Sequence, residues 1–582
     1  MPATGGALAP AGPRPPARLA RLRRSVQALR RRHLATAAAV LPPTALSAVL
    51  VLHGLAARSI WIDEASTFAV ASQRGAVLGH YLARAGGDML LYYAGMHLLV
   101  GLFGASLVVL RLPSALAAVA CVPVGFALAD HLLGRRAASF GAWLLAVCLP
   151  TVFWGQQARG YAPAELFVSA AALSLVEAVR SRRRLAWACF VACSVLAAYT
   201  TLLATVAVLA LLLALLSAPG RRELLPRAAL AAAGVAVACV PLALLATDRG
   251  TSGLGWLGAP GTAYGPSYVE LAELLASTRV AGIAPGAAAG PVALATAAAW
   301  AGAAGILLLR ARRGPLDVAS WGYVLLGSWL LLPPLVLWAA SMLVHPVLED
   351  RYVLFCVPAG SLLAGAAVSR IRPALAALAV LAALLGSRAA LVLPVYAVPI
   401  EDWSAAAAQV ARSERTGDCI AFFLADGEDA FDYYADEERL REPRPVLPSS
   451  PYSARAPYSL DPEVFTKGAL GRASSGCRRL WLVRSHASAA RLVPGAPPFQ
   501  VLKRRRYLEL LAEVRSRYRL DVARPYPGVL VELYLPRPGP AGLGRRPMPS
   551  RTGVVGAISS VTKKSDAVIP DAPPVPDLAA RR

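Results

Sequence analysis

The chain has 582 residues, of which 57% are hydrophobic, and its mean hydropathy is +0.53. This composition excludes an ordinary soluble protein, because the apolar residues come in blocks of about twenty, the length of a helix that crosses a bilayer. The formal net charge is +25, but most arginines stand in the N-terminal arm or in short clusters between apolar blocks, the pattern that sets membrane topology. The charge therefore indicates topology and argues against binding nucleic acid.

The chain begins with residues 1–33, which are rich in Pro, Ala and Arg and which we expect to form a disordered, basic, cytoplasmic arm. The apolar stretch 34–57 follows. A cleaved signal peptide is the alternative interpretation, but the stretch is longer than a usual signal-peptide core and further spans follow it. We predict an uncleaved first helix with the N-terminus in the cytoplasm.

Two adjacent carboxylates, Asp63 and Glu64, follow the first span directly, between Trp61 and Phe68. One interpretation is that they are solvated loop acids beside an aromatic interface anchor. Further along, residues 90–104 are apolar but short for a crossing. A full crossing there would move every later arginine cluster to the outer face. We therefore predict an interfacial or re-entrant helix at 90–104, within one long outer loop over 58–107.

The arginine clusters set the remaining crossings, because such clusters stay in the cytoplasm. Together with the first helix they predict about eleven crossings of roughly twenty residues each, an odd number that puts the C-terminus outside. The later spans are predicted near 108–132, 137–154, 160–179, 185–199, 201–216, 228–247, 287–309, 319–343, 353–369 and 373–393.

The C-terminal part changes to a mixed sequence at about residue 394. Residues 401–412 and 507–518 are predicted as helices, and short apolar runs at 419–424, 480–483 and 528–535 as strands. The predicted fold class is therefore a polytopic α-helical membrane protein with an extracytoplasmic α/β domain. The transmembrane domain spans 34–393 and has a second long outer loop at 248–285. The α/β domain spans 394–536, and residues 537–582 form a tail predicted to be disordered.

The eight cysteines contain no Cys-x-x-Cys pair, so the sequence gives no support for a zinc or iron–sulfur site. Six of them lie in apolar blocks, where Cys behaves as a small hydrophobic residue. Cys419 and Cys477 instead lie at or just before predicted strands of the outer domain. The sequence is equally compatible with a disulfide between these two and with two free buried thiols.

Four fragments on the predicted outer face combine acids, arginines and tyrosines. Ionisable groups at a membrane boundary are costly unless they are wet or paired, which favours a polar cavity that opens outward. In such a cavity a carboxylate can take a proton from a hydroxyl, and guanidiniums can bind a phosphate. The alternatives are snorkelling or charge-neutralising arginines and interface-belt tyrosines. The fragments carry Asp63 and Glu64; Asp88, Tyr92 and Tyr93; Arg159 and Tyr161; and Glu349, Asp350, Arg351 and Tyr352.

Glu165 follows Tyr161 by four residues and so lies on the same face of the predicted helix. It either points into the predicted cavity or is an acid near a helix end. His53, His97 and His345 show no metal-ligand spacing, and a core or interface role is predicted for each.

The motifs of the first outer loop resemble those of a known family. Trp61-Ile-Asp-Glu-Ala, then Gly-Gly-Asp-Met-Leu-Leu-Tyr-Tyr, then Leu110-Arg-Leu-Pro-Ser, is similar to the opening of bacterial relatives of the protein O-mannosyltransferases. These are integral-membrane glycosyltransferases of the C superfamily (GT-C type). Later similarities are Gln157-Ala-Arg-Gly-Tyr161, Gly255-Trp256, Arg351-Tyr352 and Glu401-Asp-Trp403, so the resemblance covers about residues 35–535.

The resemblance implies a hexosyltransferase that moves a hexose, with mannose favoured, from a polyprenyl-phosphate donor to a hydroxyl on the outer face. The acceptor is a cell-envelope polysaccharide, lipid or protein, and the expected location is the plasma membrane. Asp63 would be the catalytic base, and Glu64 would support Asp63 or hold the acceptor. Arg159 and Arg351 would bind the phosphate. The other residues that we expect to bind substrate are Asp88, Tyr92, Tyr161, Trp256 and Tyr352.

One motif departs from the family pattern: Asp88, Met89 and Leu90 stand where His-Pro-Pro is commoner. No metal site is predicted and no cofactor is required, although paired carboxylates could hold a divalent cation. Two other functions are compatible with the sequence, a transporter or flippase for lipid-linked saccharides and a non-catalytic membrane scaffold. A flippase predicts polar residues at mid-bilayer on broken helices, whereas the charges here gather at one face.

Overall fold

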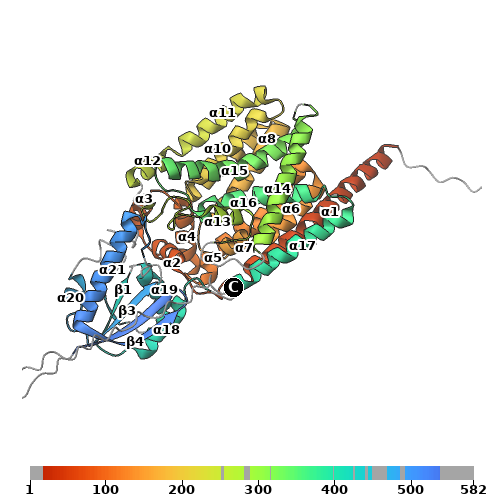
Figure 1. Cartoon of the computed structure of the whole chain (residues 1–582). Coiled ribbons are helices and arrows are strands. Elements are labelled where there is room, and N and C mark those ends of the chain that lie inside the picture. The colour runs from red at the N-terminus through yellow and green to blue at the C-terminus, as the bar shows by residue number, and fades with distance from the viewer. Residues whose placement is uncertain are drawn as a thin grey trace, which may run out of the picture. The chain divides into compact units, whose positions relative to one another are not determined.

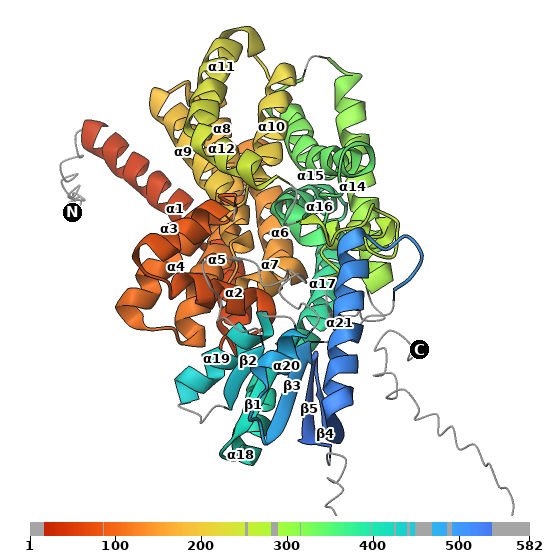
Figure 2. The same ribbon diagram turned by 90° about the vertical axis from the view of Figure 1, so that its left-hand side faces the viewer.

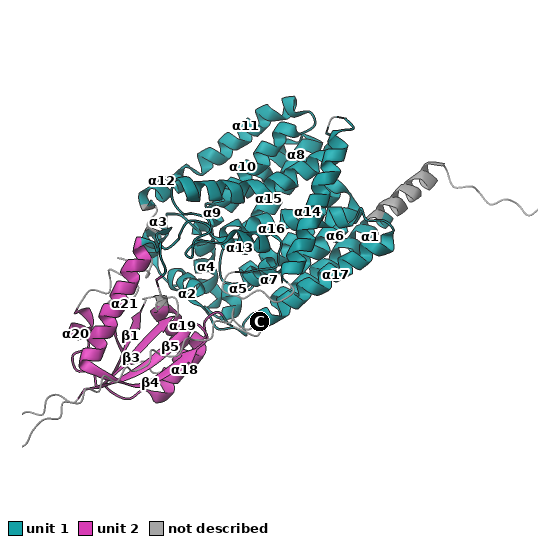
Figure 3. Cartoon of the chain, viewed as in Figure 1, with its two compact units in different colours: residues 1–281, 287–399, 493–497 teal, residues 282–286, 400–492, 498–582 magenta. Residues whose placement is uncertain are grey.

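The computed structural model describes residues 17–84, 86–250, 254–280, 289–314, 316–396, 399–423, 426–438, 443–447, 468–485 and 492–537. Figure 3 colours two compact units, residues 1–281, 287–399 and 493–497 in one and residues 282–286, 400–492 and 498–582 in the other. The first unit is helical and the second holds a five-stranded sheet (Figure 1). Nearly all of the predicted C-terminal tail, and half of the predicted N-terminal arm, lie outside the described residues.

Seven helical runs of the first unit are long and apolar enough to cross a membrane, counted over the described ranges alone. Several present large apolar side chains on their outer faces, such as Leu294, Leu343 and Leu375, each more than 70% exposed, and lipid is the natural cover for such a surface. The seven are α1 (Ala17–Leu52, apolar from His33), α5 (Leu107–Leu133), α8 (Tyr161–Ser181), α14 (Ala289–Ala311), α15 (Val318–Leu343), η3 with α16 (Asp350–Cys356 and Val357–Val368) and α17 with η4 (Ala374–Val392 and Leu393–Tyr396).

Two bent pairs of helices in the described ranges are candidates for two further crossings. The first pair, α6 (Arg135–Ala146) and α7 (Leu149–Gly155), is bent by 54°; the second, α11 (Arg221–Ala238) and α12 (Val240–Arg249), is bent by 47°. In each pair a proline, Pro150 or Pro241, is the second residue of the later helix. Proline has no amide hydrogen and clashes with the preceding turn, so a helix breaks before it.

Three shorter apolar helices complete this set: α4 (Leu90–Phe103), α9 (Arg184–Thr200) and α10 (Ala204–Ala214, continued by η1, Leu215–Ser217). Every predicted crossing coincides with a helix or a bent pair. The predicted eleven correspond to the seven long runs, the two bent pairs, α9 and α10. Helix α4 is the segment expected to lie at the interface. The number of crossings itself stays a prediction, while the multi-span helical fold is confirmed.

The long predicted outer loops are also helical in part. The loop after α1 holds α2 (Ile62–Ala71) and α3 (Gly75–Arg84) before α4. The described part of the other loop holds α13 (Tyr268–Leu275), which begins with a capping box: the Ser267 hydroxyl accepts from the Glu270 amide, and the Glu270 carboxylate accepts from the Ser267 amide. Such a box satisfies two amides that a helix start otherwise leaves without partners.

The second unit is a three-layer α/β/α arrangement. Its sheet has the strand order β2-β1-β3-β5-β4, with β1 parallel to β2 and β3, and with β5 antiparallel to β3 and β4. Helices α20 and α21 cover one face of the sheet, and α18 and α19 cover the other (Figures 1 and 2). The elements are α18 (Trp403–Ser413), β1 (Asp418–Phe423), α19 (Asp426–Glu438), β2 (Arg444–Leu447), α20 (Ala469–Ala473), β3 (Arg479–Ser485), α21 (Pro498–Arg517), β4 (Tyr518–Tyr526) and β5 (Val529–Pro536).

All three predicted strands and the first predicted helix of this unit are present. The predicted second helix is longer than expected, since α21 already begins at Pro498. The structure also joins Cys419 to Cys477 by a disulfide, which selects one of the two alternatives that the sequence leaves open. The bond ties the start of β1 to the turn before β3.

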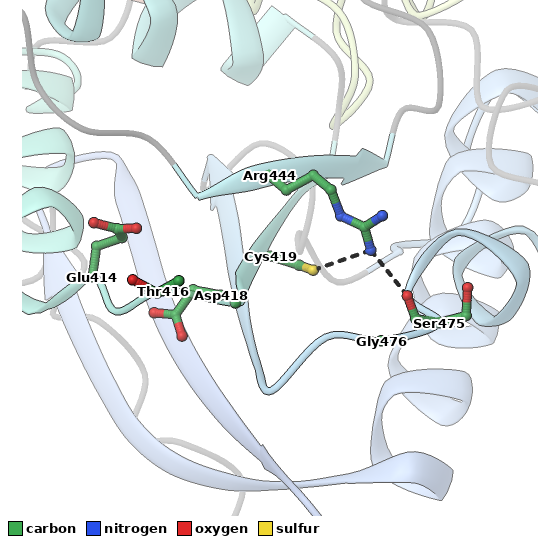
Figure 4. Close-up of a pocket in the computed structure, with 8 residues that line it drawn as sticks. Glu414, Thr416, Asp418, Cys419, Arg444, Ser475 and Gly476 are labelled. Carbon is green, nitrogen blue, oxygen red and sulfur yellow. Dashed lines mark hydrogen bonds between the residues drawn. The ribbon is translucent and has the colours of Figure 1, made fainter.

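The disulfide lies at a hollow of about 340 Å³ at the amino ends of the parallel strands (Figure 4). Arg444 of β2 closes one side: its Nη2 donates to the Ser475 carbonyl at 3.0 Å and lies 3.5 Å from the Cys477 sulfur. Next to it Asp418 is paired with Arg479 across β1 and β3. Arg444, Asp418 and Arg479 therefore stabilise the local fold around this hollow.

Removing this disulfide should destabilise the second unit. The bond closes a loop of 58 residues, and loop-closure entropy for such a length amounts to about 4 kcal/mol. We expect a Cys419→Ser, Cys477→Ser double variant to unfold earlier on heating, by an amount that reductant reproduces in the unchanged chain. The control is Cys189→Ser, since Cys189 is an exposed free cysteine. Equal unfolding of all three proteins would contradict the prediction.

Candidate active site

Asp63 and Glu64 are the second and third residues of α2. Carboxylates are favoured in a first helical turn because they face the positive end of the helix dipole. Neighbouring residues of a helix point about 100° apart, so the two acids diverge. The Asp63 side chain is 25% exposed, whereas that of Glu64 is 1% exposed. The two carboxylates therefore have different surroundings and different partners.

Glu64 is bound on every side. Its two oxygens accept from Arg111 of α5 at 2.8 and 2.7 Å, and one of them also accepts from the Ala158 amide at 2.7 Å. Such a two-point pair is the strongest form of this contact and fixes its geometry. Further Arg111 bonds go to backbone carbonyls between α1 and α2, those of Leu55, Arg58 and Ser59. Glu64 thus ties α2 to α5 and to the turn that carries Arg159.

Asp63 lies against both arginines that the sequence singles out. The Nη1 of Arg351 is 2.8 Å from Oδ2 of Asp63. The Nη1 of Arg159 donates to the Asp63 carbonyl at 3.2 Å and to the Tyr93 hydroxyl at 3.1 Å. These residues come from α2, the turn before α8, η3 and α4. The fold therefore brings a carboxylate and two guanidiniums together from three distant parts of the chain.

Aromatic rings flank the two guanidiniums. Arg351 lies 5.4 Å from the ring centre of Trp256 and 5.8 Å from that of Tyr352. Arg159 lies 5.8 Å from the ring of Tyr161, which is itself 6.4 Å from the ring of Tyr352. Cations are attracted to the faces of such rings. Trp256, Tyr161 and Tyr352 therefore help to fix the arginines in place.

The two neighbouring tyrosines of α4, Tyr92 and Tyr93, have different hydrogen-bond partners. Tyr92 is buried, and its hydroxyl is bonded to Ser114 at 3.0 Å. Ser114 in turn donates to the Arg159 carbonyl at 2.8 Å. Tyr93 is the residue that contacts the Arg159 guanidinium. This geometry suits Tyr92 for positioning Arg159 rather than for touching a substrate.

Two other acids are placed apart from the Asp63–Arg351 pair. Asp88 lies just before α4, and its Oδ1 accepts from the Leu202 amide at 3.3 Å. Glu165 is fully buried in α8, where its Oε1 accepts from the Thr151 hydroxyl at 2.7 Å. Glu165 therefore faces α7 inside the helical unit. Over the described ranges, no group of three or more His, Cys, Asp or Glu side chains is arranged to hold a metal ion.

No role was predicted from the sequence for two functional candidates, although both stand in motifs or fragments that it singles out. Arg111 was part of a motif, but the pairing with Glu64 gives it a definite task. A lone arginine inside an apolar block is the signal, because such a residue needs a partner at that depth. Glu349 is the other: it stands two residues before Arg351, and its half-buried position raises its pKa to about 7.

Glu349 should make donor binding depend on pH. The Arg351 charge opposes the rise in the Glu349 pKa, while Asp350, Glu270 and Asp63 add to it. Glu349 is therefore neutral below about pH 7 and places a further negative charge near Arg351 above it. We expect the affinity for a phosphodiester-linked lipid sugar to fall roughly five- to tenfold as the pH rises through 7.

The measurement is a binding titration between pH 5.5 and 8.5, a range in which the phosphodiester itself does not change charge. Glu349→Gln should flatten the profile. Glu532→Gln removes another buried acid with a raised pKa, in the second unit, and should leave the profile as it is. An unchanged slope in Glu349→Gln would contradict the assignment.

Comparison with known proteins gives one family match and several similar structures. Residues 90–244 match the family model for dolichyl-phosphate-mannose-protein mannosyltransferase. ArnT from Cupriavidus metallidurans bound to undecaprenyl phosphate is 14% identical, with a TM-score of 0.49 over 85% of this chain and 98% of that chain. The oligosaccharyltransferase AglB from Archaeoglobus fulgidus, in complex with an inhibitory peptide and a dolichol-phosphate, is 10% identical, with a TM-score of 0.49 over 85% of this chain and 74% of that chain.

The comparison with curated proteins finds no match for this sequence. The family match covers Tyr92, Arg159 and Tyr161 together with Arg111, which pairs with Glu64. It confirms, over residues 90–244, the resemblance of this chain to the protein mannosyltransferase family of GT-C-type membrane glycosyltransferases.

Proposed function

We propose that the chain is an integral-membrane glycosyltransferase that moves a hexose, with mannose favoured, from polyprenyl phosphate to a hydroxyl of a cell-envelope acceptor. The observation that carries this proposal is the position of Asp63, whose carboxylate is paired with the Arg351 guanidinium and whose backbone carbonyl accepts from the Arg159 guanidinium. The match to a mannosyltransferase family supports a lipid-phosphate sugar as donor. A protein, a polysaccharide and a lipid all fit as acceptor, because each offers a hydroxyl.

In the proposed reaction Asp63 takes the proton of the acceptor hydroxyl. The acceptor oxygen forms a bond to the anomeric carbon, and the bond from that carbon to the phosphate oxygen breaks. The electron pair stays on the phosphate, which leaves as polyprenyl phosphate. Arg351 and Arg159 stabilise the charge that develops there, and fixed cations in a poorly hydrated site do this without reorganising. The sugar inverts its configuration because the attack comes from the side opposite the phosphate.

The ion pair of Arg351 with Asp63 has two consequences for this reaction. The Arg351 guanidinium fixes the position of the Asp63 carboxylate, whose Oδ2 it contacts at 2.8 Å. The same guanidinium has further N–H groups that can bind the donor phosphate. Arg351 can therefore contact base and leaving group together, and Arg159, which contacts the backbone carbonyl of Asp63, completes the phosphate site.

Glu64 has a supporting role in this proposal. It is saturated by Arg111 and the Ala158 amide, so it holds the loop and not the acceptor. The proposed orientation places this site at the outer face of the plasma membrane, with the N-terminus in the cytoplasm and the α/β unit outside. The lipid tail of the donor would lie against the apolar helices.

The test is donor turnover by the purified full-length chain in lipid nanodiscs. A panel of polyprenyl-phosphate sugars is added together with a hydroxyl acceptor, and released polyprenyl phosphate and glycosylated acceptor are measured by mass spectrometry. We expect one sugar, a hexose, to be turned over, and turnover to persist in EDTA. Movement of the intact donor across a bilayer without turnover of any sugar would instead support a transporter.

A further inference from the structure

One arginine of the membrane helices has no part in the proposed reaction. Arg388 lies in α17 and is fully buried. Its Nη1 donates to the Leu144 carbonyl, and its Nη2 donates to the Ala276 carbonyl and to the Thr296 hydroxyl, each at 3.2 Å. In the described part of the chain no carboxylate forms an ion pair with it. A charged side chain at such a depth is costly, so its presence calls for a specific task.

Both carbonyls that Arg388 contacts lie where a helix stops. In a continuous helix the Leu144 carbonyl would accept from the Cys148 amide, but at the break between α6 and α7 that amide bonds to Leu145 instead, at 3.1 Å. Ala276 caps the end of α13, and the last carbonyls of a helix have no partner within it. Arg388 therefore supplies donors to two helix ends, whose partial negative charge in turn balances the guanidinium.

The bond to Ala276 joins α13, a helix of the second long outer loop, to the membrane helices. Ala276 is buried, and so are Ser277 and Thr278, which follow it. Bulk water therefore does not reach this carbonyl in place of Arg388, and a buried carbonyl without a donor is unfavourable. We expect the end of α13 to shift when Arg388 is replaced.

Helix α13 lies next to one of the two arginines of the proposed phosphate site. It packs against η3, the segment that carries Arg351. The same outer loop carries Trp256 ahead of α13, and the Trp256 ring centre lies 5.4 Å from the Arg351 guanidinium. Arg159 is held instead by the Tyr93 hydroxyl of α4 and the Asp63 carbonyl of α2. A shift of α13 therefore acts on Arg351 rather than on Arg159.

We propose that Arg388 is a positioning residue for Arg351: it fixes the end of α13, and α13 holds Arg351 where it meets Asp63 and the donor phosphate. This inference rests on the proposed glycosyl transfer. The three acceptors of Arg388 belong to α6, α13 and α14. Only a planar fork with several donors reaches all of them together, and the single ammonium of lysine does not.

The test measures polyprenyl phosphate binding to the full-length chain in nanodiscs. We expect Arg388→Met to weaken binding roughly tenfold, a usual size for coupling between residues of one network. Combined with Arg351→Gln, Arg388→Met should cause little further loss, because the residue that it positions is already gone. Combined with Arg159→Gln, it should still cause its full loss, since Arg351 then holds the phosphate alone.

Trp321→Phe is the matched control. Trp321 is also buried and also donates to a carbonyl at a helix end, that of Ala214 of α10, at 2.9 Å, but α10 carries no residue of the site. This change should lower the thermal unfolding temperature and leave phosphate binding as it is. If Arg388→Met folds poorly, Arg388→Lys, which keeps the charge and one bond, replaces it in both combinations.

Two results would overturn the role of Arg388. One is phosphate binding by Arg388→Met equal to that of the unchanged chain. The other is an equal further loss in the Arg351→Gln and Arg159→Gln backgrounds, which would show a general effect on the fold. Failure of the unchanged chain to bind polyprenyl phosphate would count against the proposed function itself.

Discussion

Asp63→Asn should reduce sugar transfer by roughly a thousandfold or more, because asparagine cannot accept the proton of the acceptor and general bases contribute 10²–10⁴ in rate. Donor binding should persist. The asparagine amide oxygen can still accept from Arg351, which lies 2.8 Å from the Asp63 carboxylate, and Arg159 keeps its bond to the backbone carbonyl of residue 63. The measurement is single-turnover transfer together with a donor-binding titration.

Asp317→Asn is the control, since Asp317 caps α15 by accepting from the Ser320 amide at 2.8 Å, a bond that asparagine keeps, and its other contact is an exposed pair with Arg310. Its transfer rate should equal that of the unchanged chain. Transfer by Asp63→Asn within tenfold of the unchanged chain would contradict the role of Asp63 as base. Loss of donor binding together with loss of transfer would indicate that Asp63 holds the donor instead.

Arg111→Met should strongly destabilise the helical unit. The Arg111–Glu64 pair is 1% exposed on both sides, and removing one partner of a buried ion pair costs about 3–5 kcal/mol because the other charge is left unpaired. Three backbone carbonyls would also lose their donor. We expect a clearly lower thermal unfolding temperature in detergent and loss of transfer.

A double variant separates the cost of leaving the Glu64 charge unpaired from the cost of losing the packing of the Arg111 side chain. Arg111→Met combined with Glu64→Gln removes both charges and should recover part of the stability that the single change loses. The control is Arg182→Met, which breaks the exposed pair with Glu223 and should change stability by less than about 1 kcal/mol. An Arg111→Met chain as stable as this control would contradict the role given to the buried pair.

The membrane helices could be predicted from the sequence because the side chains along each helix face lipid or neighbouring helices. Such a helix therefore appears in the sequence as a continuous apolar block. The breaks inside two of them depend on single prolines, Pro150 and Pro241. In the second unit, β1 and β3 are apolar runs and were predicted. Helix α19 is acidic and β4 is mostly exposed, so neither leaves an apolar pattern; β4 is held by its hydrogen bonds to β5.

The convergence of Asp63 with Arg159 and Arg351 could be predicted because all three were assigned to one membrane face. The separate roles of Asp63 and Glu64, and of Tyr92 and Tyr93, could not be predicted. Glu64 turns inward and Asp63 outward because of the phase of α2, and a sequence does not fix where a helix starts to within one residue. The choice of Tyr93 over Tyr92 as the partner of Arg159 likewise depends on the left-handed turn that starts α4.

The most direct test of the central claim is an experimental structure of the Asp63→Asn chain in nanodiscs with a bound polyprenyl-phosphate hexose. A phosphate within hydrogen-bonding distance of both the Arg159 and the Arg351 guanidinium, with residue 63 on the far side of the anomeric carbon, is the predicted result. A phosphate bound away from both arginines, or a sugar on the side of the arginines remote from residue 63, would contradict it.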